Sequence, residues 1–328
     1  MTISVAIGTF NRVAMLREAI KAALAQARAP FEIVVADDAS TDGTEEMLAA
    51  LAAADPRVKV IRRETNSGGV INCNAAMAAA SGDLIAWCSD DDRFLPGHLE
   101  TSAAFLDAHP EVGLVHSGFI DAVETAEQST IEPRPLRALT PLIVGPGNLF
   151  AYLTRYYDWP FHPSTLVIRR EVWRAVGPFD PAYALADTDW FVRAAEIFSA
   201  ALLPRHGALN RRHRDNWSNR VGSARMQGEI FEIVERAILR RWPRWRPQRT
   251  FWRAVWRANA RLRLLLTLRA RIRSGHGNAA CAAWAGLLQH TGRSVPDWLE
   301  RAGEILIRRW TRDREARFKD ARQSVSPL

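Results

Sequence analysis

Hydrophobic positions follow two different periods along the first 90 residues. Short runs of consecutive apolar and β-branched residues, such as "ISVAIG" and "EIVVAD", are typical of buried strands. Longer segments between them repeat apolar residues every three or four positions, as helices do. The predicted elements are strands at 3–8, 31–38, 57–63 and 83–89 and helices at 13–26, 43–55 and 68–82. This alternation predicts βαβ units and a parallel sheet.

The pattern beyond residue 97 is less regular. It predicts, in chain order, a helix at 98–110, a strand at 112–120, a mobile loop at 121–147, a strand and short helix at 163–180, and a helix at 186–200. The loop prediction rests on four prolines and many polar residues. From about residue 225 the pattern is helical to the end, and there are no internal repeats.

Polar residues gather where the predicted strands end. Thr9 to Asn11 follow the first strand, Asp37 and Asp38 the second, and Asp90 to Asp92 the fourth. Parallel sheets bind ligands beyond these carboxyl ends. Three adjacent carboxylates repel one another and are costly to desolvate. The "DDD" run is therefore either a solvated acidic turn or a site that a cation neutralises.

Positive charge is concentrated at the C-terminal end. Residues 240–328 carry 21 Lys and Arg against 6 Asp and Glu, whereas the preceding 239 residues carry 23 against 30. Tryptophans are interleaved with these arginines, namely Trp242, Trp245, Trp252 and Trp256. Basic amphipathic helices with tryptophan are typical of anionic membrane surfaces. Alternatively, the helices pack on the body of the protein or on a second subunit, which predicts a homodimer through this region.

Other partners and compartments are constrained by what the sequence lacks. No motif that reads nucleic acid is present, so no nucleic-acid partner is expected. No apolar run approaches the ~20 residues of a membrane span, and no signal peptide is visible. The three cysteines show no metal-type spacing. We therefore expect a cytoplasmic protein, peripheral on the cytoplasmic face of the membrane if the basic region binds lipid.

Five segments, in order, resemble the motifs of the family 2 glycosyltransferases. They are "VAIGTFNR", "EIVVADDASTDGT", "NSGGVINCNAAMAAASGDLIAWCSDDDRFLP", "VGPFDPAYALADTDWFVR" and "RRHRDNWS". The resemblance covers about residues 1–220. It implies an α/β, GT-A-type fold with a Rossmann-like nucleotide-binding sheet. The implied domains are a nucleotide-sugar-binding half at 1–105, an acceptor-binding half at 106–225 and a basic helical C-terminal region at 226–328.

The family's reaction is then the expected one. The resemblance implies an inverting transfer from a nucleotide-sugar donor, linked to UDP, dTDP or GDP, to a hydroxyl of a carbohydrate or lipid-linked acceptor. Synthesis of cell-surface polysaccharide or glycolipid is typical of the family. The family's metal, Mg²⁺ or Mn²⁺, would be held by Asp91, with Asp90 sharing it or contacting ribose and Asp92 in support. Asp187 matches the catalytic base, and Asp189 is the competing carboxylate.

The resemblance also implies a set of donor-binding residues. They are Thr9, Phe10, Asn11, Asp37, Asp38, Asn66, Gly68, Asn74, Asp90, Arg211 and His213. Structural alternatives remain for several of them. Phe10 would serve equally as a core aromatic, and Asp37 with Asp38 as caps of the following helix. The arginines around His213 suit either a diphosphate or a solvated basic loop.

Four positions depart from the family's pattern. Gly8 replaces a proline, Phe10 replaces a tyrosine, Cys73 stands where an arginine is common, and Ala186 stands where glutamate is common. These changes bear on the identity of the donor more than on the reaction.

Two other classes of function fit parts of the sequence. A sugar-nucleotide nucleotidyltransferase shares the α/β plan, but it needs a glycine-rich loop with a lysine that "GTFNR" does not supply. A non-catalytic binding protein could use the basic tail, but it would leave the acids at the strand ends unexplained.

Overall fold

The computed structural model describes residues 1–124, 129–134, 136, 140–147, 162–217, 223–241 and 247–257. The chain divides into two compact units, residues 1–220 and 221–328. The first unit is built on one ten-stranded sheet.

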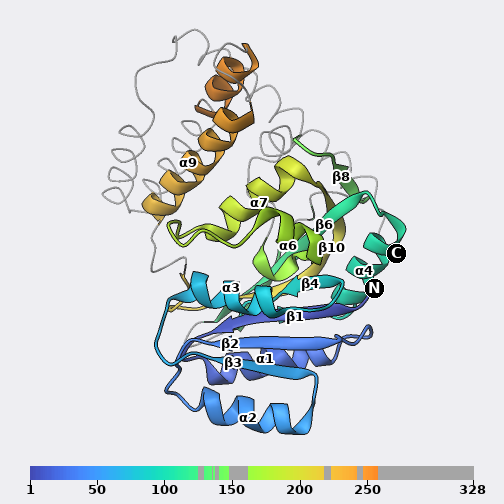
Figure 1. The fold of residues 1–328 in the computed structure, drawn as a ribbon, viewed down its shortest axis with the longest axis vertical. Coiled ribbons are helices and arrows are strands. Elements are labelled where there is room, and N and C mark those ends of the chain that lie inside the picture. The colour runs from blue at the N-terminus through green and yellow to red at the C-terminus, as the bar shows by residue number, and fades with distance from the viewer. Residues whose placement is uncertain are drawn as a thin grey trace. The chain divides into compact units, whose positions relative to one another are not determined.

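The N-terminal part of the sheet confirms the predicted βαβ units. Its elements are β1 (Ile3–Thr9), α1 (Val13–Leu24), β2 (Glu32–Asp37), α2 (Thr44–Ala54), β3 (Val58–Arg62), α3 (Gly69–Ala79) and β4 (Leu84–Trp87). Strands β3, β2, β1 and β4 are parallel neighbours. Because β3 and β4 lie on opposite sides of β1, right-handed crossovers place α3 on the other face of the sheet from α1 and α2 (Figure 1).

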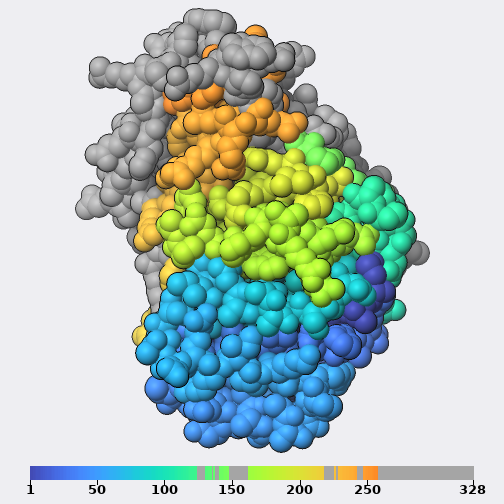
Figure 2. All heavy atoms as spheres, viewed as in Figure 1, coloured from blue at the N-terminus to red at the C-terminus, as the bar shows by residue number. Residues whose placement is uncertain are grey.

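The second part of the first unit continues the same sheet. Its elements are β5 (Arg93–Phe94), α4 (His98–Ala108), β6 (Val112–Glu124), β7 (Ser129–Pro133), β8 (Leu142–Val144), η1 (Pro163–Thr165), β9 (Val167–Arg169), α6 (Arg170–Val176), α7 (Ala186–Ile197) and β10 (Ser199–Arg212). Strand β9 is antiparallel to both β4 and β6, and so it joins the two parts. Figure 2 shows both parts forming one continuous surface.

One prediction for this part was wrong. The predicted loop at 121–147 contains the end of β6 together with β7 and β8, which pair antiparallel with β6 and β10. There, pairing with a distant strand overrides a polar, proline-containing local pattern. The predicted helix at 186–200 is confirmed as α7, which ends earlier, at Ile197, and the long strand β10 follows at once.

The N-terminal strands form a tightly packed core. Val5, Ile7, Val35 and Ala86 are fully buried, together with Leu16 and Ile20 from α1. Consecutive apolar residues suit strands that are covered on both faces. The rigid core therefore fixes the carboxyl ends of β1, β2 and β4, where the polar residues lie.

The second unit includes α9 (Ser223–Arg241) and a further helical stretch at 247–257. Trp256 is buried against Phe231, with 6.3 Å between ring centroids, and its Nε1 donates to the Phe231 carbonyl at 3.3 Å. Arg253 and Arg257 both donate to Glu235 Oε1. The residues at 258–328, with Trp242 and Trp245, lie outside the described part.

Within the described ranges, no helix has the length and apolarity needed to cross a membrane.

Candidate active site

The strand ends predicted to bind ligand lie together at one edge of the sheet. Thr9 is in register with Asp37 on the neighbouring strand, and β4 leads directly to Asp90. The Thr9 hydroxyl donates to Asp90 Oδ2 at 2.8 Å. The parallel register is what brings residues 81 positions apart into hydrogen-bond contact.

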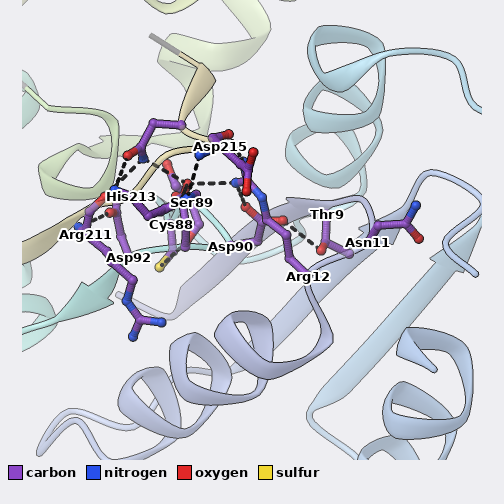
Figure 3. A network of polar contacts seen from close by, with 12 residues as sticks. Thr9, Asn11, Arg12, Cys88, Ser89, Asp90, Asp92, Arg211, His213 and Asp215 are labelled. Atoms are coloured by element: carbon purple, nitrogen blue, oxygen red, sulfur yellow. Dashed lines mark hydrogen bonds and ion pairs between the residues drawn. The ribbon is translucent and has the colours of Figure 1, made fainter. Parts of the chain in front are cut away.

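All three aspartates of the "DDD" run are buried, with exposed fractions of 6%, 8% and 2% for Asp90, Asp91 and Asp92. The interpretation as a solvated acidic turn is therefore wrong. A cation neutralises two of them: Arg12 Nη1 lies 2.8 Å from Asp90 Oδ1 and 2.7 Å from Asp91 Oδ2 (Figure 3). The same guanidinium donates through Nη2 to the Asp215 carbonyl at 3.1 Å.

Burial and mutual repulsion dominate the electrostatics of this run. Burial raises the pKa of Asp90, the ion pair with Arg12 opposes that shift, and Asp91 adds to it. Burial and the charge of Asp91 also raise the pKa of Asp92. For Arg12, burial lowers the pKa, but Asp90 and Asp91 outweigh it and hold the pKa above its ordinary value. The site thus concentrates more negative charge than the one guanidinium balances.

Asp92 has different partners from its two neighbours. Its Oδ2 accepts from the Ser164 hydroxyl at 2.6 Å, and its Oδ1 accepts from the Arg211 backbone N–H at 3.1 Å. His162 Nδ1 lies 3.5 Å from Oδ2. Asp92 therefore ties the end of β4 to η1 and to the end of β10.

The segment His213–Trp217 contacts the cluster from the C-terminal end of β10. His213 Nε2 lies 3.2 Å and Asn216 Nδ2 3.4 Å from Asp91 Oδ2. The Asn216 side chain also accepts from the His213 backbone N–H at 2.5 Å, which closes the turn. The exposed Trp217 donates from Nε1 to the Ala184 carbonyl at 3.0 Å.

Arg211 and His213 are thus not part of a solvated basic loop. Arg211 is only 5% exposed, and its guanidinium is ion-paired with Glu18 on α1. In Figure 3 this side chain runs toward α1, away from His213. Of the two predicted donor-binding residues, only His213 places its side chain on the aspartate run.

The acids after β2 organise the neighbouring turns. Asp37 is ion-paired with Arg62 and accepts the Ser40 N–H at 3.1 Å. Asp38 Oδ2 accepts the Gly68 N–H at 2.8 Å, and its Oδ1 accepts both the N–H and the hydroxyl of Ser67. Asp38 thereby brings the predicted residues at 66–68 to the end of β2; the Asn66 side chain also accepts the Gly68 N–H, at 3.1 Å.

Of the remaining predicted donor-binding residues, Phe10 is exposed, whereas Asn11 and Asn74 form hydrogen bonds with other segments of the chain. Phe10 is 41% exposed, so its interpretation as a core aromatic is wrong. Asn11 accepts the Thr41 N–H at 2.7 Å and orders the loop after β2. Asn74 exchanges two hydrogen bonds with the Phe179 backbone, at 2.8 and 2.9 Å, and so joins α3 to the segment that leads to α7.

Two departures from the family's pattern prove to be neighbours. A Cβ on Gly8 would lie 2.8 Å from Cys73 Sγ and 3.2 Å from its backbone nitrogen. Cys73 thus occupies the space that a side chain at position 8 would need. Its thiol pKa is raised to about 12, first by burial and then by the charges of Asp90, Asp187 and Asp38.

The structure distinguishes the two candidates for the base. Both lie in the first turn of α7, but Asp189 Oδ2 is ion-paired with Arg193 Nε at 2.8 Å. Asp187 accepts the Thr188 N–H at 2.7 Å, and no arginine or lysine of the described residues forms an ion pair with it. Burial raises its pKa, which the hydrogen bond to Thr188 and the nearby His162 oppose.

Sequence reasoning missed three polar residues of the site. Arg12 stands within "GTFNR", directly after the first strand. This position at a strand end could have identified it as a residue of the site. Ser164 and His162 come from a stretch with no recognisable motif. Burial and the charges of Asp91 and Asp187 act on His162 in opposite directions, and burial prevails, lowering its pKa to about 4.

The fit of a metal ion can be judged from the donor groups. No three His, Cys, Asp or Glu side chains of the described residues form a ready-made metal-binding group. Asp90 and Asp91 nevertheless already direct one oxygen each at a single cationic nitrogen. Mg²⁺ is usually held by one or two carboxylates and completes its shell with substrate phosphate and water. The pair Asp90 and Asp91 therefore fits such an ion.

Comparison with known proteins identifies the family. The family model described as "Glycosyl transferase family 2" matches residues 4–172, more than half of the chain. The glycosyltransferase YwdF of Bacillus subtilis is 32% identical over 212 residues, which cover 62% of this chain and 72% of YwdF. The glycosyltransferase alr2836 of Nostoc is 33% identical over 187 residues, 55% of each chain.

A solved structure shares the fold. Residues 1–349 of TarS from S. aureus, in complex with UDP-GlcNAc, match with a TM-score of 0.66 at 17% identity, covering 94% of this chain and 89% of that one. The mixed α/β architecture is thus the GT-A type that the sequence motifs predicted. From the family match and the YwdF relationship, this chain belongs to glycosyl transferase family 2.

Proposed function

We propose that this family 2 glycosyltransferase moves a sugar from a nucleoside-diphosphate sugar to an acceptor hydroxyl with inversion. The observation that carries the proposal is that the segment after β10 contacts both the aspartate run and the approach to α7. Asn216 Nδ2 lies 3.4 Å from Asp91 Oδ2, and Trp217 Nε1 donates to the Ala184 carbonyl at 3.0 Å. Asp38, Asp90 and Asp187 lie after β2, after β4 and at the start of α7. They would provide nucleotide recognition, charge at the diphosphate and a base, all within one site.

The donor would bind across the carboxyl ends of the strands. Phe10 is exposed next to Thr9 and offers a face on which a nucleobase can stack. Asp38 already receives backbone N–H groups, and it would accept a further hydrogen bond from the ring NH of the base. TarS was solved with UDP-GlcNAc, so UDP is the first nucleotide to test.

Negative charge develops on the diphosphate as it leaves. A Mg²⁺ or Mn²⁺ ion held by Asp90 and Asp91 would supply Lewis-acid stabilisation of that charge. His213 contacts the same oxygen of Asp91 as Arg12 and would help to orient that carboxylate. Asp92, bonded to Ser164 and Arg211, would hold the end of β4 in place.

Asp187 would take the proton from the acceptor hydroxyl as that hydroxyl attacks the anomeric carbon. Its pKa is raised by burial, which makes it a better proton acceptor than an ordinary exposed aspartate. The ion pair with Arg193 leaves Asp189 less suited to the task. A single displacement by the acceptor inverts the anomeric centre, and no covalent intermediate is needed.

Donor binding and donor hydrolysis test the proposal directly. Thermal unfolding is followed with a panel of nucleotide sugars, with and without Mn²⁺, because a ligand that binds only the folded state raises the apparent stability. We expect the largest shift with a nucleotide sugar and metal together, and slow release of nucleoside diphosphate. Release of pyrophosphate from a nucleoside triphosphate and a sugar phosphate would indicate a nucleotidyltransferase instead. An absence of both would favour a binding protein.

The acceptor, we propose, is lipid-linked and is met at a membrane surface. The support is the excess of Lys and Arg in residues 240–328. Among the described residues, however, Trp256 and Arg257 are buried and Arg253 pairs with Glu235, so all three already have partners within the second unit. Lipid contact would fall to other residues of the region. Co-sedimentation with anionic vesicles that fails, or that persists in high salt, would contradict this proposal.

A further inference from the structure

The guanidinium of Arg12 lies at the centre of the acid cluster. Nη1 donates to one oxygen of Asp90 and one of Asp91, at 2.8 and 2.7 Å. Nη2 donates to the Asp215 carbonyl at 3.1 Å. The side chain is 21% exposed, so most of it is enclosed by the site. No motif of the sequence analysis assigned Arg12 a role.

A divalent cation held between Asp90 and Asp91 would take the two oxygens that Arg12 now contacts. A cation held by Asp90 Oδ1 and Asp91 Oδ2 would lie at ~2.0–2.6 Å from them, close to the position of Nη1. The ion and the guanidinium would then be in contact, and like charges at that distance repel strongly in a poorly hydrated site. The two cations are alternatives, so one must leave when the other enters.

We propose that Arg12 is an internal counter-ion of the acid cluster, displaced when a divalent cation binds and then available to the diphosphate of the nucleotide. This inference rests on the proposed function. A guanidinium matches two phosphate oxygens with its planar fork, so the displaced side chain gains a new partner only when nucleotide is present.

Cooperativity between metal and nucleotide follows from this exchange. Without nucleotide, the metal must break the contacts of Arg12 with Asp90 and Asp91, and nothing replaces them. With nucleotide bound, the phosphate oxygens take over the guanidinium. The nucleotide therefore strengthens metal binding, and by linkage the metal strengthens nucleotide binding by the same factor.

The test measures Mn²⁺ binding to the full-length protein by the paramagnetic resonance signal of free Mn²⁺, with and without UDP. The variant is Arg12→Gln, and the control is Arg17→Gln, an exposed arginine on α1, the helix that Arg12 precedes. We expect Arg12→Gln to bind Mn²⁺ alone about 10-fold more tightly than the wild type, within the usual range of coupling factors. UDP should then improve Mn²⁺ affinity less than in the wild type. Arg17→Gln should match the wild type.

Other outcomes separate this inference from the proposed function. If Arg12→Gln fails to fold, Arg12→Lys, which keeps the charge but loses the fork, should still reduce the UDP effect. Equal Mn²⁺ affinity in folded Arg12 and Arg17 variants would overturn the counter-ion role while leaving donor binding intact. UDP binding that never responds to Mn²⁺ would overturn it as well. If the wild type binds neither UDP nor any other nucleotide of the panel, the proposed function itself fails.

Discussion

Buried carboxylates occupy both ends of the parallel strands, and their environments are opposite. Glu32 opens β2 and is 1% exposed; it accepts hydrogen bonds from Ser4, Lys59 and both the N–H and hydroxyl of Ser81. Burial raises its pKa, but these hydrogen bonds outweigh burial and bring the pKa to about 2. At the carboxyl ends, burial raises the pKa values of Asp90 and Asp92 and the bonds do not compensate.

The difference lies in the number of donors available to each charge. Glu32 alone receives four hydrogen bonds, whereas Asp90 receives two, from Thr9 and from an Arg12 nitrogen that it shares with Asp91. A fully bonded carboxylate stabilises the fold, because its charged form is favoured in the native state. A cluster with too few donors costs stability and retains attraction for a further cation. The number of hydrogen-bond donors therefore distinguishes Glu32, which stabilises the fold, from Asp90 and Asp91 of the candidate site, and no sequence motif is needed for the distinction.

Loss of the base should have the largest effect. Asp187→Asn removes the proton acceptor but adds no volume, so we expect the transfer rate to fall by ~10²–10⁴-fold. Donor affinity should stay near the wild-type value, because the base acts on the acceptor. Transfer kinetics and donor titration measure the two quantities. A dead Asp189→Asn beside an active Asp187→Asn would reassign the role.

Asp91→Asn should remove the response to metal. In the wild type, a ligand at 100 times its dissociation constant adds ~2.7 kcal/mol of apparent stability. The variant loses a ligand charge, so the Mn²⁺-dependent part of the thermal shift with UDP should disappear. Asp107→Asn, at an exposed and distant carboxylate, is the control. A wild-type metal response in Asp91→Asn would remove Asp91 from the site.

Glu32→Gln should destabilise the first unit by ~1.5–3 kcal/mol, the usual worth of hydrogen bonds to a charged group. The folded pKa is below the unfolded one, so the stabilisation is complete above about pH 4.5 and is lost as the pH falls toward 2. Urea unfolding at pH 7 and pH 3 measures both effects. Glu64→Gln, at an exposed position, controls for the charge change. An equal loss of stability at pH 7 and at pH 3 would contradict the stabilising role assigned to the charge of Glu32.

Asp92→Asn should increase the free energy of unfolding by ~1 kcal/mol, which is the smallest effect and opposite in sign to that of Glu32→Gln. The folded pKa of Asp92 is raised to about 8, first by burial and then by Asp91, so its contribution becomes unfavourable as the pH rises from about 4 to 8. Asparagine removes that pH dependence and retains an acceptor for the Arg211 N–H. Unfolding in the presence of a chelator at pH 5 and pH 8 tests this. A variant that is less stable than the wild type at pH 8 would show that the charge of Asp92 is well compensated.

The sequence by itself determined the N-terminal sheet and the general position of the site. Consecutive apolar runs can be buried only as strands covered on both faces, and strands joined by helices pair in parallel. The residues after β1, β2 and β4 had to meet at one edge once that pairing was fixed. The i,i+4 spacing of Asp189 and Arg193 is visible in the sequence as well, but only the structure shows that the two form an ion pair.

Tertiary structure alone decided which partner each charge has. Arg12 was visible after the first strand, but its contacts with Asp90 and Asp91 depend on β4 lying beside β1. The strand at 199–212 was missed, because its pairing with β6 joins segments that are far apart in the sequence. The local sequence pattern shows only which residues are apolar. Burial and donor count, which set the pKa values of the acids, arise only when distant segments pack together.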